Sequence, residues 1–236
     1  MTFRSLTAII LLAALAAACA PAATPTEPVA VELPPAAAQP TEPSPSEPAA
    51  TDEVTAGAAT YTFIAGETIA RFVIDEVLSG NPKTVIGSTD RLTGTLNLDL
   101  SAPSQAALGP IQVDLTSLET DSGFRNRAIQ DAILQTGKAG NQFATFSATQ
   151  IEGLPETVTP GTSYELQITG DLTIMGTTRQ VTFDAVVTPV SADRIEGTAS
   201  LTVPYADFGV EIPFLPPQVA SVEDIVRLEI DLAAAR

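Results

Sequence analysis

The 236-residue sequence contains no histidine and no tryptophan, and its single cysteine is Cys19. Without histidine, the chain lacks the side chain that most often serves as general base, proton shuttle or zinc ligand. One cysteine excludes an internal disulfide and any metal site built from several thiolates. We therefore expect no catalytic residues, no metal and no cofactor in the ordinary sense.

Positive charge is also scarce, since 11 Lys and Arg face 28 Asp and Glu and give a formal net charge of −17. Phosphates are bound by clustered basic side chains, so this balance excludes nucleic acid and an anionic membrane surface as direct partners. Adjacent carboxylates such as Asp75 and Glu76 point to opposite faces of a strand and cannot act as a catalytic pair. The sequence also has no nucleophile-elbow serine motif, phosphate-binding glycine loop or calcium loop. The chain is predicted not to be an enzyme.

The longest apolar run, residues 9–18, is too short to span a bilayer, which takes about 20 residues. Arg4 precedes this run, and three alanines lead from it directly into Cys19. The pattern resembles a bacterial lipoprotein signal, which predicts a signal peptide over 1–18 and lipid attachment at Cys19. Because two or more acyl chains make a stable anchor, we expect a protein held at the outer face of a membrane, at the cell surface or in the periplasm. The alternative is an ordinary secretory peptide in which Cys19 has no role.

Residues 19–59 are rich in Pro, Ala, Thr and Glu and contain no Lys, Arg or aromatic residue. Such a composition cannot bury enough apolar surface to offset chain entropy, which predicts a disordered linker. Repeated proline and glutamate favour extended conformations that act as a spacer. We therefore divide the chain into a signal peptide (1–18), a lipidated cysteine with its linker (19–59) and one folded domain (60–236).

Within 60–236 the dominant pattern is alternation of apolar and polar residues, which is typical of strands with one buried face. The alternation is clearest over 164–174, and it recurs over 70–74, 92–100, 181–187, 195–203 and 226–232. Residues 123–136 instead have helical spacing, which predicts one amphipathic helix that packs on the sheet or covers one end of a barrel. Turn residues at 79–82, 175–176 and 191–193 separate the strands. Long strands in local hairpins predict an all-β antiparallel meander, which loses its exposed edges by closing into a barrel.

Several segments of this domain resemble the YceI-like family, in the order and with the spacing of that family. They are 111–127 (IQVDLTSLETDSGFRNR), 143–147 (FATFS), 168–183 (ITGDLTIMGTTRQVTF), 203–209 (VPYADFG) and 222–232. The resemblance implies an extended, lipocalin-like antiparallel β-barrel of about eight strands. It also implies an elongated apolar cavity outside the cytoplasm that binds a polyisoprenoid chain, and a barrel of this size is just wide enough for one slender ligand.

The candidate ligand-binding residues are the apolar side chains that alternation places on the inner face, together with one aromatic residue of a proline-rich loop. They are Phe72, Ile74, Leu96, Leu98, Phe146, Leu166, Ile168, Ile174, Phe183, Leu201 and Phe214. The same alternation is expected if these side chains simply fill the barrel. Phe214 and Leu215 lie between prolines and are interpreted either as a lid over the barrel mouth or as a plug that stabilises it.

Three arginines, Arg125, Arg127 and Arg179, are candidates for binding a pyrophosphate or quinone oxygen at one end of the ligand. The alternative for each is an ion pair with a neighbouring carboxylate. We thus predict a non-catalytic lipoprotein that binds, carries or sequesters an apolar isoprenoid-like lipid. A barrel with a filled interior would instead predict a cell-surface adhesion or assembly module.

Overall fold

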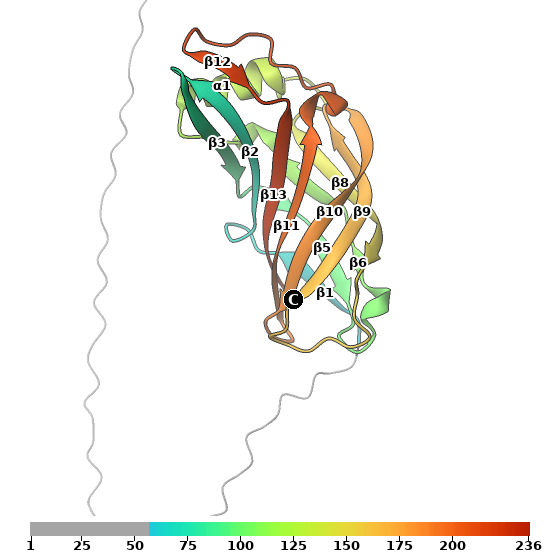
Figure 1. Ribbon diagram of the computed structural model, residues 1–236. Coiled ribbons are helices and arrows are strands. Elements are labelled where there is room, and N and C mark those ends of the chain that lie inside the picture. Colours follow the sequence, from blue (N-terminus) through green and yellow to red (C-terminus); the bar gives the residue numbers. More distant parts are fainter. Residues whose placement is uncertain (1–56) are drawn as a thin grey trace, which may run out of the picture. The chain divides into compact units, whose positions relative to one another are not determined.

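The computed structural model describes residues 57–236 (Figure 1). The predicted signal peptide, Cys19 and nearly all of the predicted linker lie outside the described residues. Residues 57–236 belong to one compact unit. This unit contains its own hydrophobic core, which is the property of a domain that folds independently.

The described residues form one curled antiparallel sheet, which confirms the predicted all-β, lipocalin-like fold. Its strands are β1 (Ala59–Phe63), β2 (Ile69–Leu78), β3 (Asn81–Thr89), β4 (Leu92–Thr93), β5 (Thr95–Leu98), β6 (Ala107–Leu108), β7 (Ile111–Asp114), β8 (Phe143–Glu152), β9 (Tyr164–Ile174), β10 (Thr177–Pro189), β11 (Arg194–Pro204), β12 (Val219–Val222) and β13 (Ile225–Ala235). The 13 strands in this part of the chain exceed the expected eight because bends break the first half of the domain into the short strands β4, β5, β6 and β7.

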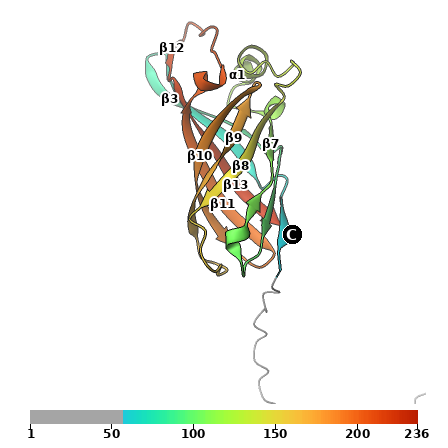
Figure 2. The same ribbon diagram turned by 90° about the vertical axis from the view of Figure 1, so that its right-hand side faces the viewer.

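The long strands β8, β9, β10, β11 and β13 are consecutive neighbours and form the continuous wall of the barrel (Figure 2). Two hairpins of this sheet use two-residue turns, Ser79–Gly80 between β2 and β3 and Met175–Gly176 between β9 and β10. All four turn residues have positive φ, the conformation that matches the right-handed twist of paired strands. The turns fix the register and with it the face to which each side chain points.

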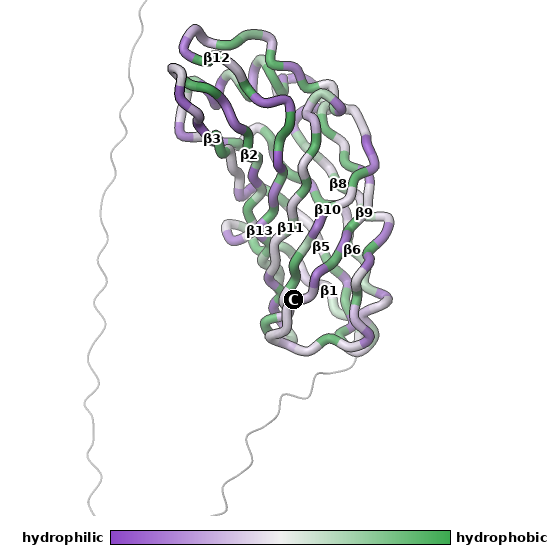
Figure 3. Tube along the Cα trace, viewed as in Figure 1, coloured by the Kyte–Doolittle hydropathy of each residue, from purple (hydrophilic) through white to green (hydrophobic). Residues whose placement is uncertain are grey.

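β13 joins the two ends of the domain, because it pairs with β11 along its whole length, with β2 near its start and with β1 near its end. Along the long strands, hydrophobic and hydrophilic residues alternate, as Figure 3 shows for β10 and β11. In each of these strands the apolar set faces the barrel interior. The alternation of apolar and polar residues in the sequence therefore identifies the residues on the inner face of the barrel.

The sheet does not close by regular strand pairing, since β3 pairs only with β2 and leaves an edge. A single bridge between Ser88 and Glu119 connects this edge to the chain after β7. Beside it lie the short helix α1 (Gly123–Arg127) and a π-helical turn (Ala128–Ile133), which together replace the predicted helix over 123–136. Three 3-10 turns complete the described structure: Pro103–Gln105, Leu115–Ser117 and Tyr205–Phe208.

The two ends of the barrel differ in packing. At the end near the C-terminus, Tyr61, Ile195 and Ala234 are completely buried, and the Tyr61 hydroxyl donates a hydrogen bond of 2.7 Å to the Ala192 carbonyl. Burial raises the pKa of Tyr61 above its ordinary value. At the opposite end lie α1 and β12 (Figures 1 and 2). Five of the eight large hydrophobic side chains that remain exposed are at this end or on the strands beside it: Ile86, Phe124, Phe214, Leu215 and Ile225.

None of the helical segments in residues 57–236 has the length and hydrophobicity needed to cross a bilayer.

Candidate ligand cavity

The barrel interior contains three apolar chambers. The end chamber, of about 300 Å³, lies between β2, β13, the α1 segment and the loop before β12. The middle chamber, of about 140 Å³, lies between β2, β7, β8, β9 and β13. The far chamber, of about 110 Å³, lies between β5, β9, β10 and β13. The interior of this barrel is therefore hollow over much of its length.

Neighbouring chambers share wall residues, so the three lie in a row. Phe72 and Ile174 line both the end chamber and the middle chamber. Ile168 and Ala199 line both the middle chamber and the far chamber. A row of apolar chambers matches a long, slender apolar molecule better than a compact one.

The structure places ten of the eleven residues predicted to contact a ligand on chamber walls. Phe72, Ile74, Ile174 and Phe214 line the end chamber; Phe146, Ile168 and Phe183 line the middle chamber; Leu96, Leu98 and Leu166 line the far chamber. Leu201 does not line any of the three chambers; it is partly buried against the hydrophobic core cluster. Phe146 and Phe183 form an edge-to-face pair with ring centroids 5.1 Å apart on the wall of the middle chamber.

Many of these inward side chains are not fully buried. Phe72, Ile74 and Ile168 are half-buried although they point into the barrel, because one side of each faces the open chamber rather than another side chain. An apolar wall that remains accessible is unusual for a packed core, in which voids larger than a water molecule are few. This observation separates a hollow barrel from the filled barrel that alternation alone also allowed.

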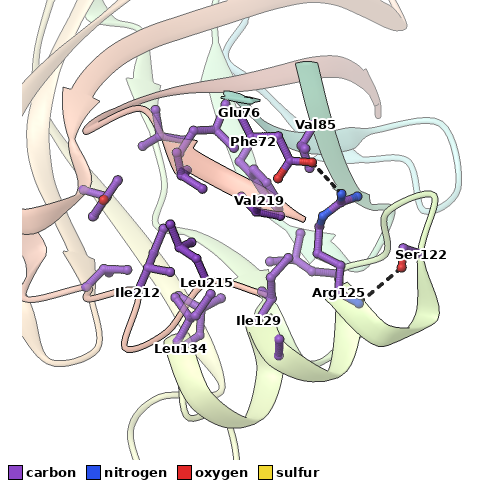
Figure 4. Close-up of a pocket in the computed structure, with 18 of the residues that line it drawn as sticks. Phe72, Glu76, Val85, Ser122, Arg125, Ile129, Leu134, Ile212, Leu215 and Val219 are labelled. Atoms are coloured by element: carbon purple, nitrogen blue, oxygen red, sulfur yellow. Dashed lines mark hydrogen bonds and ion pairs between the residues drawn. The ribbon is translucent and has the colours of Figure 1, made fainter. Parts of the chain in front are cut away.

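Polar groups gather at only one place in the row, on the wall of the end chamber near α1. Glu76 on β2 accepts a hydrogen bond of 2.8 Å from Arg125 on α1, and its side chain is only 6% exposed (Figure 4). The other terminal nitrogen of Arg125 pairs with Asp121, which also accepts a hydrogen bond of 2.7 Å from Lys83. The hydrogen bond from Lys83, followed by the charge of Arg125, lowers the pKa of Asp121.

The backbone places this cluster through the start of α1. Ser122 caps the helix by accepting a hydrogen bond from the Arg125 amide, and the Ser122 side chain also lines the end chamber. Tyr205 lines the same chamber, and burial followed by the charge of Asp224 raises the pKa of its hydroxyl. The polar wall therefore combines a carboxylate, a guanidinium and hydroxyl groups.

Of the three arginines proposed from the sequence, only Arg125 reaches a chamber. Arg125 also forms ion pairs with Glu76 and Asp121, as the alternative interpretation expected. It therefore lines the cavity and is paired with carboxylates at the same time. Arg179 is exposed and donates to the carbonyl of its neighbour Thr178, and Arg127 lies on α1 but does not line a chamber. In residues 57–236, no three carboxylate side chains converge in a way that would hold a metal ion.

Glu76 is the site residue that the sequence interpretation missed. Alternation from Phe72 through Ile74 places Glu76 on the inner face of β2, so the pattern does indicate its inward direction. Charged side chains are almost never fully buried unless they are paired, and a solvated carboxylate is therefore the default expectation. Its partner Arg125 lies 49 residues further along the chain, and nothing in the sequence relates the two positions.

The fold and its row of apolar chambers define a lipocalin-like β-barrel with a hollow, elongated interior. This chain belongs to the family of proteins with a YceI-like domain, whose family model matches residues 61–234. A search of curated proteins finds no match.

Solved structures of three bacterial proteins share the fold. A polyisoprenoid binding domain from Saccharophagus degradans, implicated in plant cell wall breakdown, is 18% identical with a TM-score of 0.56 over 74% of this chain and 97% of that one. Burkholderia cenocepacia BcnA gives the same identity and TM-score over 73% of this chain and 99% of its own. A Campylobacter jejuni YceI protein is 18% identical with a TM-score of 0.51 over 64% and 84% of the two chains.

Proposed function

We propose that the barrel binds one apolar, isoprenoid-like lipid along its row of chambers and carries or sequesters it without catalysis. The observation that carries this proposal is the continuous apolar wall through the end, middle and far chambers. Removing apolar surface from water contributes about 25 cal/mol per Å², so the affinity for a chain rises with the length it inserts. That the domain from Saccharophagus degradans is described as polyisoprenoid binding supports the same class of ligand.

Phe214 and Leu215 fit the lid interpretation better than the plug. Both line the end chamber, yet 55% of Phe214 and 40% of Leu215 remain exposed. A plug that stabilised the barrel would bury these side chains, whereas a lid needs only one face against the chamber. We infer that the ligand passes between this loop and α1.

We further propose that the protein is exported and anchored to a membrane through acylated Cys19, with the residues before the domain as a spacer. The support is the apolar run and the alanines that lead into the only cysteine. Metabolic labelling of the full chain with a radioactive fatty acid tests this directly. Label on the wild-type chain that is lost in Cys19→Ser is expected, and an unlabelled wild-type chain would refute the anchor.

Native mass spectrometry of residues 51–236, exported and purified without detergent, tests the lipid. We expect a discrete added mass that organic extraction removes and that is identifiable as a lipid. An unliganded mass that persists after incubation with quinones and polyprenols would overturn the proposal and favour the adhesion or assembly module.

A variant pair tests whether the chambers act as one row. Ala199 lies on the shared wall of the middle and far chambers, so Ala199→Phe should close the far chamber and shorten the longest chain that binds. Ser200→Phe adds the same ring on the next residue of β11, whose side chain points to the other face of the sheet, and should leave chain length unchanged. Equal chain-length limits in both variants would contradict a ligand that reaches the far chamber.

A further inference from the structure

Glu76 and Arg125 on the wall of the end chamber belong to a charge network in which each cation has a carboxylate partner. Lys83, Asp121, Arg125 and Glu76 are linked in that order by ion pairs, which gives two positive and two negative groups. Arg125 is the only one of the two cations that lines the chamber, and it already contacts both carboxylates. An incoming phosphate would have to compete with Glu76 for this guanidinium.

The position of Glu76 makes that competition unfavourable for an anion. Its carboxylate lies on the chamber wall among apolar side chains, where charges are screened less than at the surface. One oxygen accepts from Arg125, and within the part of the chain that the structure describes no donor reaches the other. In Figure 4 this second oxygen is turned toward the cavity-lining side chains and not toward Arg125.

A free carboxylate oxygen on a cavity wall is complementary to a hydrogen-bond donor. Arg125 uses two of its five N–H groups in the pairs with Glu76 and Asp121, so donors remain beside the same spot. A hydroxyl group can satisfy both neighbours, because it donates to Glu76 and accepts from Arg125. A quinone oxygen can only accept, and a phosphate at neutral pH adds negative charge beside Glu76.

We propose that the Glu76–Arg125 pair makes the end chamber selective for an isoprenoid alcohol and against the corresponding phosphate or diphosphate. This inference rests on the proposed lipid-binding function and names the ligand class within it. The apolar chambers hold the chain whatever its head group, and Glu76 discriminates between head groups. A site for diphosphate would require clustered cations free to form bidentate contacts.

The test is a competition between ligands that share one chain. Residues 51–236 are stripped of lipid and incubated with equimolar geranylgeraniol, geranylgeranyl diphosphate and the corresponding hydrocarbon without a head group, and the complexes are counted by native mass spectrometry. We expect the alcohol complex to exceed the diphosphate complex by at least about tenfold, because one like charge beside a poorly solvated carboxylate costs at least that much. A diphosphate that binds as well as the alcohol would overturn the inference while the lipid-binding function stands.

Absence of binding by all three ligands would refute the proposed function itself, so the two failures are distinguishable. Glu76→Gln keeps the shape of the side chain but removes its charge, and it should reduce the alcohol preference over the diphosphate to about threefold or less. Glu165→Gln removes the same charge from an exposed position on β9 and should leave the preference unchanged. An unchanged preference in folded Glu76→Gln would assign the selectivity to another group and contradict the inference.

Discussion

Removal of Arg125 alone should destabilise the domain far more than removal of the whole Glu76–Arg125 pair. In Arg125→Met, the Glu76 carboxylate keeps its position at 6% exposure and loses the cation that pairs with it, while Lys83, its cross-strand neighbour on β3, pairs with Asp121. Two unit charges 4 Å apart interact by about 4 kcal/mol at the effective dielectric constant of a protein surface. Because Arg125 is still 20% exposed, we expect a loss of about 3 kcal/mol in the free energy of unfolding.

In the double variant Glu76→Leu with Arg125→Met, apolar side chains replace the pair in an apolar wall, and the loss should shrink to about 1 kcal/mol or less. The assay is urea unfolding of residues 51–236 followed by far-UV circular dichroism, since the chain has no tryptophan to report by fluorescence. Arg179→Met is the matched control, because Arg179 is exposed and bonds only to a neighbouring carbonyl; its effect should stay within about 0.5 kcal/mol.

The result that would refute this reasoning is a double variant as unstable as Arg125→Met. Equal losses would mean that the Arg125 side chain stabilises the domain through its packing contacts. Its compensation of the Glu76 charge would then contribute little. The comparison is sensitive to this difference because the same substitution at position 125 is present in both proteins.

Three further predictions concern the wall, the packed end and the lid. Gly87→Ala would place a Cβ 2.1 Å from the Phe72 ring and should cost about 1–3 kcal/mol in urea unfolding, whereas Gly137→Ala meets no atom within 4 Å and should cost less. Burial raises the pKa of Tyr61, so its contribution to stability is complete below the ordinary value of 10.0 and is lost as pH rises through the folded-state pKa. Stability measured against pH should therefore decline less steeply above about pH 10 in Tyr61→Phe. Phe214→Ser should change stability by about 0.5 kcal/mol or less and accelerate lipid release in a dissociation assay; unchanged release with reduced stability would indicate a plug.

The inner face of the barrel is predictable because the side-chain period of a strand does not depend on what the strand packs against. Alternation alone assigns Phe72, Ile168 and Leu166 to the interior, and all three lie on chamber walls. Alternation does not predict whether the barrel interior is a cavity or is filled by side chains, because both kinds of barrel require the same alternation. Only the partial accessibility of such inward residues distinguishes the two.

The polar end of the cavity depends on contacts between segments that are far apart in the sequence. Arg125 and Arg127 are equivalent by residue type and lie two positions apart, but a helix turns them to different directions, and only Arg125 meets Glu76. The helix itself ends at Ile133 and becomes π-helical after Arg127, a local change that apolar spacing does not encode. Local pattern therefore predicts the strands, whereas tertiary contacts select the site.

The pairing of β13 has a consequence for the order of events during chain synthesis. Residues 225–235 follow every other strand in the chain, yet they connect β11, β2 and β1 in a single sheet. Until this segment has been synthesised, β1 and β2 have no strand to pair with on the long wall, and only the two-residue strand β4 links the first part of the domain, through β7, to β8. The barrel therefore cannot be completed while the chain is still being synthesised, and its dependence on distant pairings makes slow folding the expectation. A chain halted before residue 225 would present exposed apolar strand faces, which make such species prone to aggregation and are the reason chaperones are needed.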